Sequence, residues 1–102
     1  MSSSFTTFSS PALRRFSTTQ VATSTTKTQV LTPPANITTR RIVLLVQNTS
    51  TTDTVQLMGN ATDTVGVVLP PQSQFSLDNY NGGLWAVADS GTPAINITIG
   101  SV

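Results

Sequence analysis

The sequence contains no cysteine, no histidine and no glutamate, and only 9% of its 102 residues are charged. Without cysteine there is no disulfide and no thiolate nucleophile, and without histidine the commonest general base and metal ligand are missing. We therefore expect a non-enzymatic protein with no catalytic residues, no cofactor and no metal site. A domain this small, with neither disulfide nor metal, is also expected to gain stability by self-association.

The remaining polar residues do not form a recognisable site. Each aspartate stands alone in a separate turn, so the chain has no Asp-x-Asp-x-Asp calcium loop. The glycines of "NGG" (residues 81–83) precede a predicted strand instead of a helix, which argues against a phosphate cradle. These residues are interpreted as turn formers, as aspartate and glycine commonly are.

Charge is divided along the chain. All five basic residues lie within the first 41 positions and all four acidic residues follow them. This division predicts a basic N-terminal segment that lies on an acidic surface. Five dispersed cations are too few for strong phosphate-driven binding, so we expect no nucleic-acid partner. The longest apolar run, "IVLLV", has the length of a strand and not of a membrane span, so no membrane association is expected.

Residues 1–39 are rich in serine and threonine and show no sustained hydrophobic period. Such a segment favours extended chain, with possible short strands at 20–23 and 28–31. It cannot bury enough apolar surface to order itself, so we predict an arm held by neighbouring subunits through strand addition. The predicted anchors of this arm are Phe5, Phe8, Leu13, Arg14, Arg15 and Phe16.

Residues 40–102 alternate apolar and polar side chains with period two and have turn signals about every ten residues. The pattern predicts six short strands at 41–47, 54–58, 65–69, 74–77, 84–88 and 95–99. Together they predict an all-β fold, a small antiparallel β-sandwich or barrel preceded by the long extended arm. Trp85 is predicted to lie in the core, and Tyr80 is a candidate surface-loop contact.

The order of these pieces resembles a small all-β module common in structural genes of tailed bacteriophages. The resemblance covers residues 40–99 and consists of core and turn residues. Its parts are Arg41 before the first strand, Gln47-Asn48, Leu57 to Gly59, Leu69 to Pro71, "DNYNG" from Asp78, Trp85 to Ala88, and Ile95 to Ile99.

The resemblance implies a virion structural protein, most simply a capsid decoration or cement protein that fastens neighbouring subunits. The implied partners are the major capsid protein or tail and adaptor subunits, and the expected assembled form is a homo-oligomer, for which we suggest a trimer. Two further hypotheses remain open: a tail or head–tail accessory or fibre-attachment protein, and a host-surface module that binds glycans near Tyr80. A serine-rich, acid-free start with two arginines is also found in mitochondrial presequences, although Pro11 interrupts any helix there.

Overall fold

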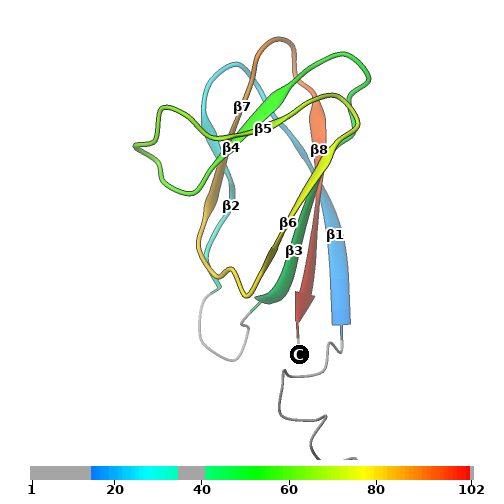
Figure 1. The fold of residues 1–102 in the computed structure, drawn as a ribbon, viewed down its shortest axis with the longest axis vertical. Coiled ribbons are helices and arrows are strands. Elements are labelled where there is room, and N and C mark those ends of the chain that lie inside the picture. Colours follow the sequence, from blue (N-terminus) through cyan, green and yellow to red (C-terminus); the bar gives the residue numbers. More distant parts are fainter. Residues whose placement is uncertain (1–14, 35–40, 102) are drawn as a thin grey trace, which may run out of the picture.

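The structure is a computed structural model, and it describes residues 15–34 and 41–101 (Figure 1). These residues form strands and connecting turns. The strands are β1 (Arg15–Ala22), β2 (Thr28–Leu31), β3 (Arg41–Asn48), β4 (Val55–Met58), β5 (Val67–Leu69), β6 (Gln74–Asp78), β7 (Leu84–Ala88) and β8 (Ala94–Ser101).

The strands form two four-stranded sheets. Sheet A has the order β1-β8-β3-β6 and sheet B the order β2-β7-β4-β5, and every neighbouring pair is antiparallel. Consecutive strands alternate between the sheets, except for the β4–β5 hairpin. This is the strand order of an eight-stranded jelly roll. The predicted all-β class and sandwich architecture are thus confirmed.

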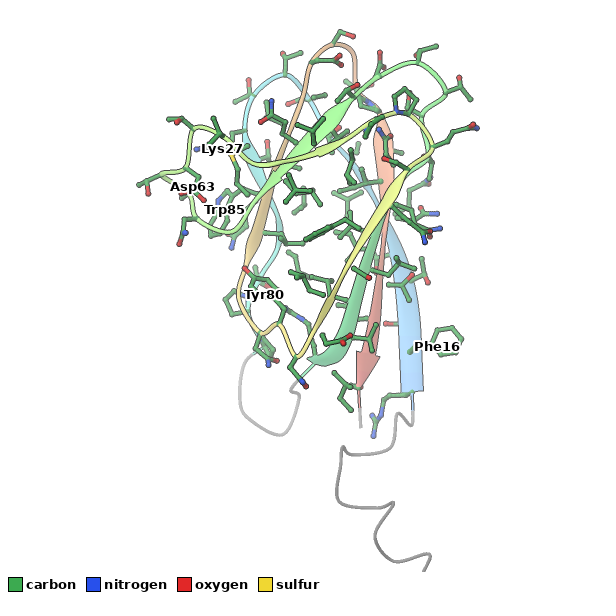
Figure 2. The ribbon with its side chains drawn as sticks, viewed as in Figure 1. Phe16, Lys27, Asp63, Tyr80 and Trp85 are labelled. Carbon is green, nitrogen blue, oxygen red and sulfur yellow. The ribbon has the colours of Figure 1, made fainter. Side chains whose placement is uncertain are left out.

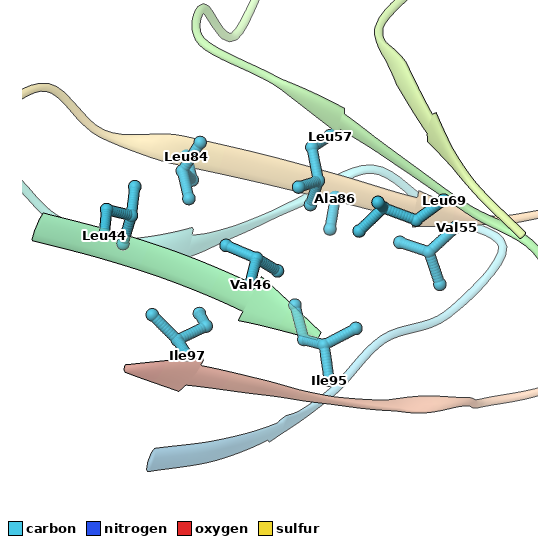
Figure 3. Close-up of a cluster of buried hydrophobic side chains, with 9 residues drawn as sticks. All are labelled: Leu44, Val46, Val55, Leu57, Leu69, Leu84, Ala86, Ile95 and Ile97. Carbon is cyan, nitrogen blue, oxygen red and sulfur yellow. The ribbon is translucent and has the colours of Figure 1, made fainter. Parts of the chain in front are cut away.

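A single hydrophobic core fills the space between the sheets (Figure 3). Alternate residues of the central strands point into it, which explains the period of two in the sequence. Each fully buried aliphatic side chain contributes about 1.5–3 kcal/mol relative to leaving it exposed. The cluster consists of Leu44, Val46, Val55, Leu57, Leu69, Leu84, Ala86, Ile95 and Ile97.

All six strands predicted after residue 40 lie within one or two residues of their expected bounds. The strand expected at 65–69 is shortened to the three residues of β5 (Val67–Leu69). Only Leu69 of that segment enters the core, whereas Val65 is 78% exposed and Val67 40% exposed. Sharing a face with Leu69 therefore does not bury these two valines, because β5 is an edge strand and, within the described part of the chain, has a neighbour on one side only.

The main correction concerns residues 15–34, which were assigned to an arm separate from the domain. β1 pairs with β8 over its whole length, and β2 pairs with β7. The predicted boundary between residues 39 and 40 therefore falls between two strands of one sandwich. The predicted strand at 28–31 coincides with β2, and the one predicted at 20–23 is the end of the longer β1. A strand can join a sheet through main-chain hydrogen bonds even where its side chains are hydroxyls.

Polar contacts fasten this N-terminal segment to the rest of the sandwich. At the corner between β1 and β2, the main-chain N and the Oγ1 of the buried Thr23 both donate to the Pro93 carbonyl oxygen, at 2.9 and 2.6 Å. Next to it, the Ala88 N–H donates to the Ser24 carbonyl oxygen at 2.8 Å. These hydrogen bonds hold the corner where the chain changes from sheet A to sheet B.

Candidate assembly interface

The described residues hold no cluster of three or more Asp, Glu, His or Cys side chains that could bind a metal ion. Within the same residues, no helix has the length and hydrophobicity needed to cross a membrane. The notable surfaces are instead the open edges of the two sheets, where main-chain hydrogen-bonding groups face away from the sandwich.

β1 is the longest of these edges. It pairs with β8 on one side, no strand of the described residues lies on the other, and seven of its eight residues are exposed. Two of the predicted anchors, Arg15 and Phe16, open this strand, and Phe16 is 73% exposed. Figure 2 shows the Phe16 ring projecting away from the body of the sandwich. The other predicted anchors, Phe5, Phe8, Leu13 and Arg14, lie outside the described residues.

In sheet B, the edge farthest from β2 is formed by β5, and its exposed side chains are apolar. Val65, Val67 and Val68 are 78%, 40% and 55% exposed, and the strand carries no charged residue. Exposed apolar side chains on an unpaired strand are a template for association with another chain. The sequence pattern places Val65, Val67 and Leu69 on one face but does not indicate that Val65 and Val67 lie exposed at a sheet edge. An uncharged valine run that ends at Pro70 and Pro71 could have indicated an edge.

The open edges lie in two pairs. A short connection at residues 23–27 joins the edge strands β1 and β2, and another at 70–73 joins the edge strands β5 and β6. Each flank of the sandwich thus carries one edge of each sheet. Because each sheet has four antiparallel strands, its two edges run in opposite directions. A second copy in the same orientation would therefore meet the first with antiparallel strands in both sheets.

Tyr80, the candidate surface-loop contact, is half-buried and packs against the core. Its hydroxyl donates to the Gly83 carbonyl oxygen at 2.5 Å, so the ring and the hydroxyl serve the β6–β7 turn. An added Cβ at Gly82 would come within 2.6 Å of this hydroxyl, so the turn needs glycine there. The position of Tyr80 therefore does not favour a sugar site at this turn.

Trp85 is not part of the core cluster, which corrects the sequence-based prediction. β7 turns Leu84, Ala86 and Ala88 inward, so Trp85 lies half-buried on the outer side of sheet B. On the same side of the molecule, the Lys27 Nζ donates to the Asp63 carbonyl oxygen at 2.6 Å and ties the β4–β5 connection to the start of β2 (Figure 2). Side chains of a strand alternate between its two faces, and large residues can lie on either one. The alternation within β7 alone did not say which of its faces was inward.

Arg41 was counted among the basic residues expected to lie on an acidic surface, but the structure buries it. The guanidinium donates to the carbonyl oxygens of Gly82, at 2.8 Å, and Thr32, and the Arg41 N–H donates to the Asn81 Oδ1 at 2.7 Å. Burial lowers the pKa of Arg41 below its usual value, and the nearby Tyr80 opposes this shift. Arg41 thus clamps the end of the N-terminal segment to the β6–β7 turn.

No family model and no curated protein matches this sequence. One similar solved structure comes from work on Bacillus endospore appendages, described as a family of disulfide-linked pili. It aligns with a TM-score of 0.55 and 11% sequence identity, over 84% of this chain and 81% of the other. The likeness is one of fold: both chains share the β architecture, whereas this chain has no cysteine with which to form a disulfide.

Proposed function

We propose that this protein is a non-enzymatic structural subunit of an external multi-subunit assembly. The form we favour is a tailed-phage virion, in which the chain acts as a capsid decoration or cement protein and its partners are the major capsid protein and further copies of itself. The fold neighbour supports the broader part of this proposal, because it too belongs to an external assembly, a pilus. The phage assignment is supported by the sequence resemblance over residues 40–99.

The observation that carries the proposal is the open edge of β1. Its eight residues have no strand on one side in the part of the chain that the structure describes, and they carry one charge, at Arg15, with no proline to block pairing. Folded proteins usually protect such an edge with charges, proline, bulges or a covering segment. An edge left open in this way suits a protein whose normal state is joined to a neighbour through added strands.

The flanks suggest how copies would join. β1 and β2 of one copy would pair with β6 and β5 of the next, and the contact would repeat head to tail because the two flanks differ. A ring, such as the trimer we propose, results if the rotation between copies closes, and a filament results if it does not. Either form would be held without disulfides, because the chain has no cysteine.

The predicted N-terminal anchors would make a second kind of contact, separate from the strand edges. Of the predicted anchors, Phe5, Phe8, Leu13 and Arg14, which precede β1 in the chain, would contact the capsid lattice. Edge pairing would then join copies to one another, and the anchors would join them to the particle. A tail or head–tail accessory protein would use the same contacts on a ring of different order.

The edge contact is tested by replacing Thr19 of β1 with lysine. Thr19 is exposed and lies opposite the core residue Ile97, so the lysine would place an inward-pointing charge on the edge, a feature that blocks strand addition. Light scattering should then show an oligomer for the wild-type protein and a monomer for Thr19→Lys. Thr51→Lys, which changes the same residue type in an exposed turn, should keep the oligomer. A wild-type protein that stays monomeric at all concentrations would contradict the edge contact.

The location on the particle requires a separate experiment. Wild-type protein should bind to phage capsids prepared without it and appear by electron microscopy at regular positions on the shell. The double variant Phe5→Ala, Phe8→Ala should oligomerise normally but bind the shell less. Binding to tails alone would replace the capsid assignment with the tail alternative, and binding to neither would remove the virion assignment.

A further inference from the structure

The outer face of sheet A is a second surface, separate from the strand edges. In β3 and β8 the core residues Leu44, Val46, Ile95 and Ile97 point inward, so the residues between them point outward. The strand register extends this face across the sheet. It is formed by Phe16, Thr18 and Gln20 of β1, Asn96, Thr98 and Gly100 of β8, Val43, Leu45 and Gln47 of β3, and Gln74, Ser76 and Asp78 of β6.

Four carboxamide side chains lie in one row across this face. Gln20 is paired with Asn96, Asn96 with Gln47, and Gln47 with Gln74, so one amide stands on each of the four strands. Neighbouring strands lie about 4.8 Å apart, which makes the row a regular series. Among the described residues, none of the four side-chain amides has a hydrogen-bond partner within the protein. Each amide therefore offers two N–H donors and one carbonyl acceptor to a ligand.

The adjacent rows supply hydroxyl and apolar groups. Thr18, Thr98, Leu45 and Ser76 form the next row, in which the Oγ1 atoms of Thr18 and Thr98 are 2.8 Å apart. The row beyond it places the exposed Phe16 beside Gly100, followed by Val43. Gly100 is buried and adds no side chain, so Phe16 and Val43 are the apolar groups of this row.

Charge is nearly absent from this face. Within the described residues, Asp78 at the β6 edge is the one charged residue of this face, which has no arginine or lysine among them. A phosphorylated or acidic polymer would find no cation to pair with here. The combination of many hydrogen-bonding groups, a few apolar groups and almost no charge matches a neutral sugar, whose hydroxyls both donate and accept while its C–H faces pack on aromatic rings.

From these observations we infer that the outer face of sheet A binds a neutral glycan, with the amide row of Gln20, Asn96, Gln47 and Gln74 as the hydrogen-bonding track and Phe16 as its apolar border. The inference does not depend on the edge contacts of the proposed assembly. If both hold, the edges join the copies and the faces remain outward, so each copy would add one glycan site and raise the avidity of the particle.

The probe is a set of neutral polysaccharides, namely mannan, dextran, laminarin and arabinogalactan, tested by affinity gel electrophoresis of the full-length protein. We expect at least one of them to retard the wild-type protein. The double variant Gln47→Ala, Asn96→Ala should weaken that binding about tenfold or more, because two hydrogen-bonding groups at the centre of the row are lost. Phe16→Ala should weaken it as well, and because Phe16 is 73% exposed we expect this variant to fold normally.

Gln29→Ala is the matched control, because it removes an exposed amide from β2 in the other sheet and should leave binding unchanged. Circular dichroism of each variant verifies the fold. Failure of all four polysaccharides to bind, or equal binding by wild type and the double variant, overturns the inference. Retardation by heparin or polygalacturonate alone also overturns it, as does a face-to-face dimer in sedimentation that the double variant abolishes while Thr19→Lys leaves it intact.

Discussion

β1 and β8 lie side by side in sheet A, have the same length and are paired at every residue. They differ in how deeply their side chains are buried and in how many strands they pair with. β8 buries Ile95 and Ile97 in the core and has a strand on both sides. β1 is exposed except at Val21, which packs against the core from the sheet edge. The comparison shows that main-chain pairing places a strand in a sheet, whereas apolar side chains are required only of the strands that cover the core.

The largest expected effect comes from shortening the side chains of β8 and β1 at the same register position. Ile97→Ala should lower the free energy of unfolding by about 2–5 kcal/mol, because Ile97 is 2% exposed and leaves a cavity. Thr19→Ala, directly opposite in β1, should cost less than about 1 kcal/mol, because Thr19 is exposed. Urea unfolding measures both values. Equal losses would show that β1 takes part in the core as fully as β8.

The clamp at Arg41 should have the next largest effect. Arg41→Met should cost about 2–3 kcal/mol, because the carbonyl oxygens of Thr32 and Gly82 lose a charged donor in a buried site. Hydrogen exchange should also become faster in β2, just before the clamp. Arg15→Met, at an exposed position of β1, should change stability by less than about 0.5 kcal/mol. Unchanged exchange in β2 would mean that the clamp does not hold the N-terminal segment.

A smaller effect is expected at the corner that joins β1 to β2. Thr23→Val keeps the shape of the side chain but removes the Oγ1 donor to the Pro93 carbonyl oxygen, at a cost of about 1 kcal/mol. For a domain of this size that corresponds to a fall in Tm of about 4–8 °C, measurable by calorimetry. Thr26→Val, at an exposed position of the same turn, serves as the control. A Tm that does not change would show that the main-chain bonds of Thr23 and Ser24 hold the corner without the hydroxyl.

The smallest effect compares the two strands through a contact that they share. Thr18→Val and Thr98→Val each remove one side of the same exposed hydroxyl pair, so each should cost only a few tenths of a kcal/mol, about 0.2–0.5. A double-mutant cycle from urea unfolding should give a coupling energy of similar size. A coupling above about 1 kcal/mol would indicate that β1 contributes more to the sheet through side chains than its exposure implies.

The strands after residue 40 could be predicted because their alternation reflects burial on one or both faces. Leu44 and Val46 of β3 and Ile95 and Ile97 of β8 form such patterns, and all four lie in the core. β1 could not be recognised in the same way. Its sequence "RFSTTQVA" has no alternation, because an edge strand can leave most of its side chains in solvent.

The surfaces could be predicted less well than the strands. Phe16 was identified as a candidate contact from its isolation in a polar segment, and it is exposed at the start of β1. The amide row could not be found, because Gln20, Asn96, Gln47 and Gln74 are scattered over more than half the chain. Only the register of three strand pairs brings them into line.

The sequence by itself determined the β class, the position of most strands and turns, and the lack of the side chains that metal and thiol chemistry need, because alternation and composition are local properties of the chain. The tertiary structure alone decided that residues 15–34 belong to the sandwich, that Trp85 faces outward and Arg41 inward, and which strands form the edges. These features depend on pairing between residues far apart in the chain, and main-chain hydrogen bonds, which are the same for every residue except proline, leave no mark on the sequence.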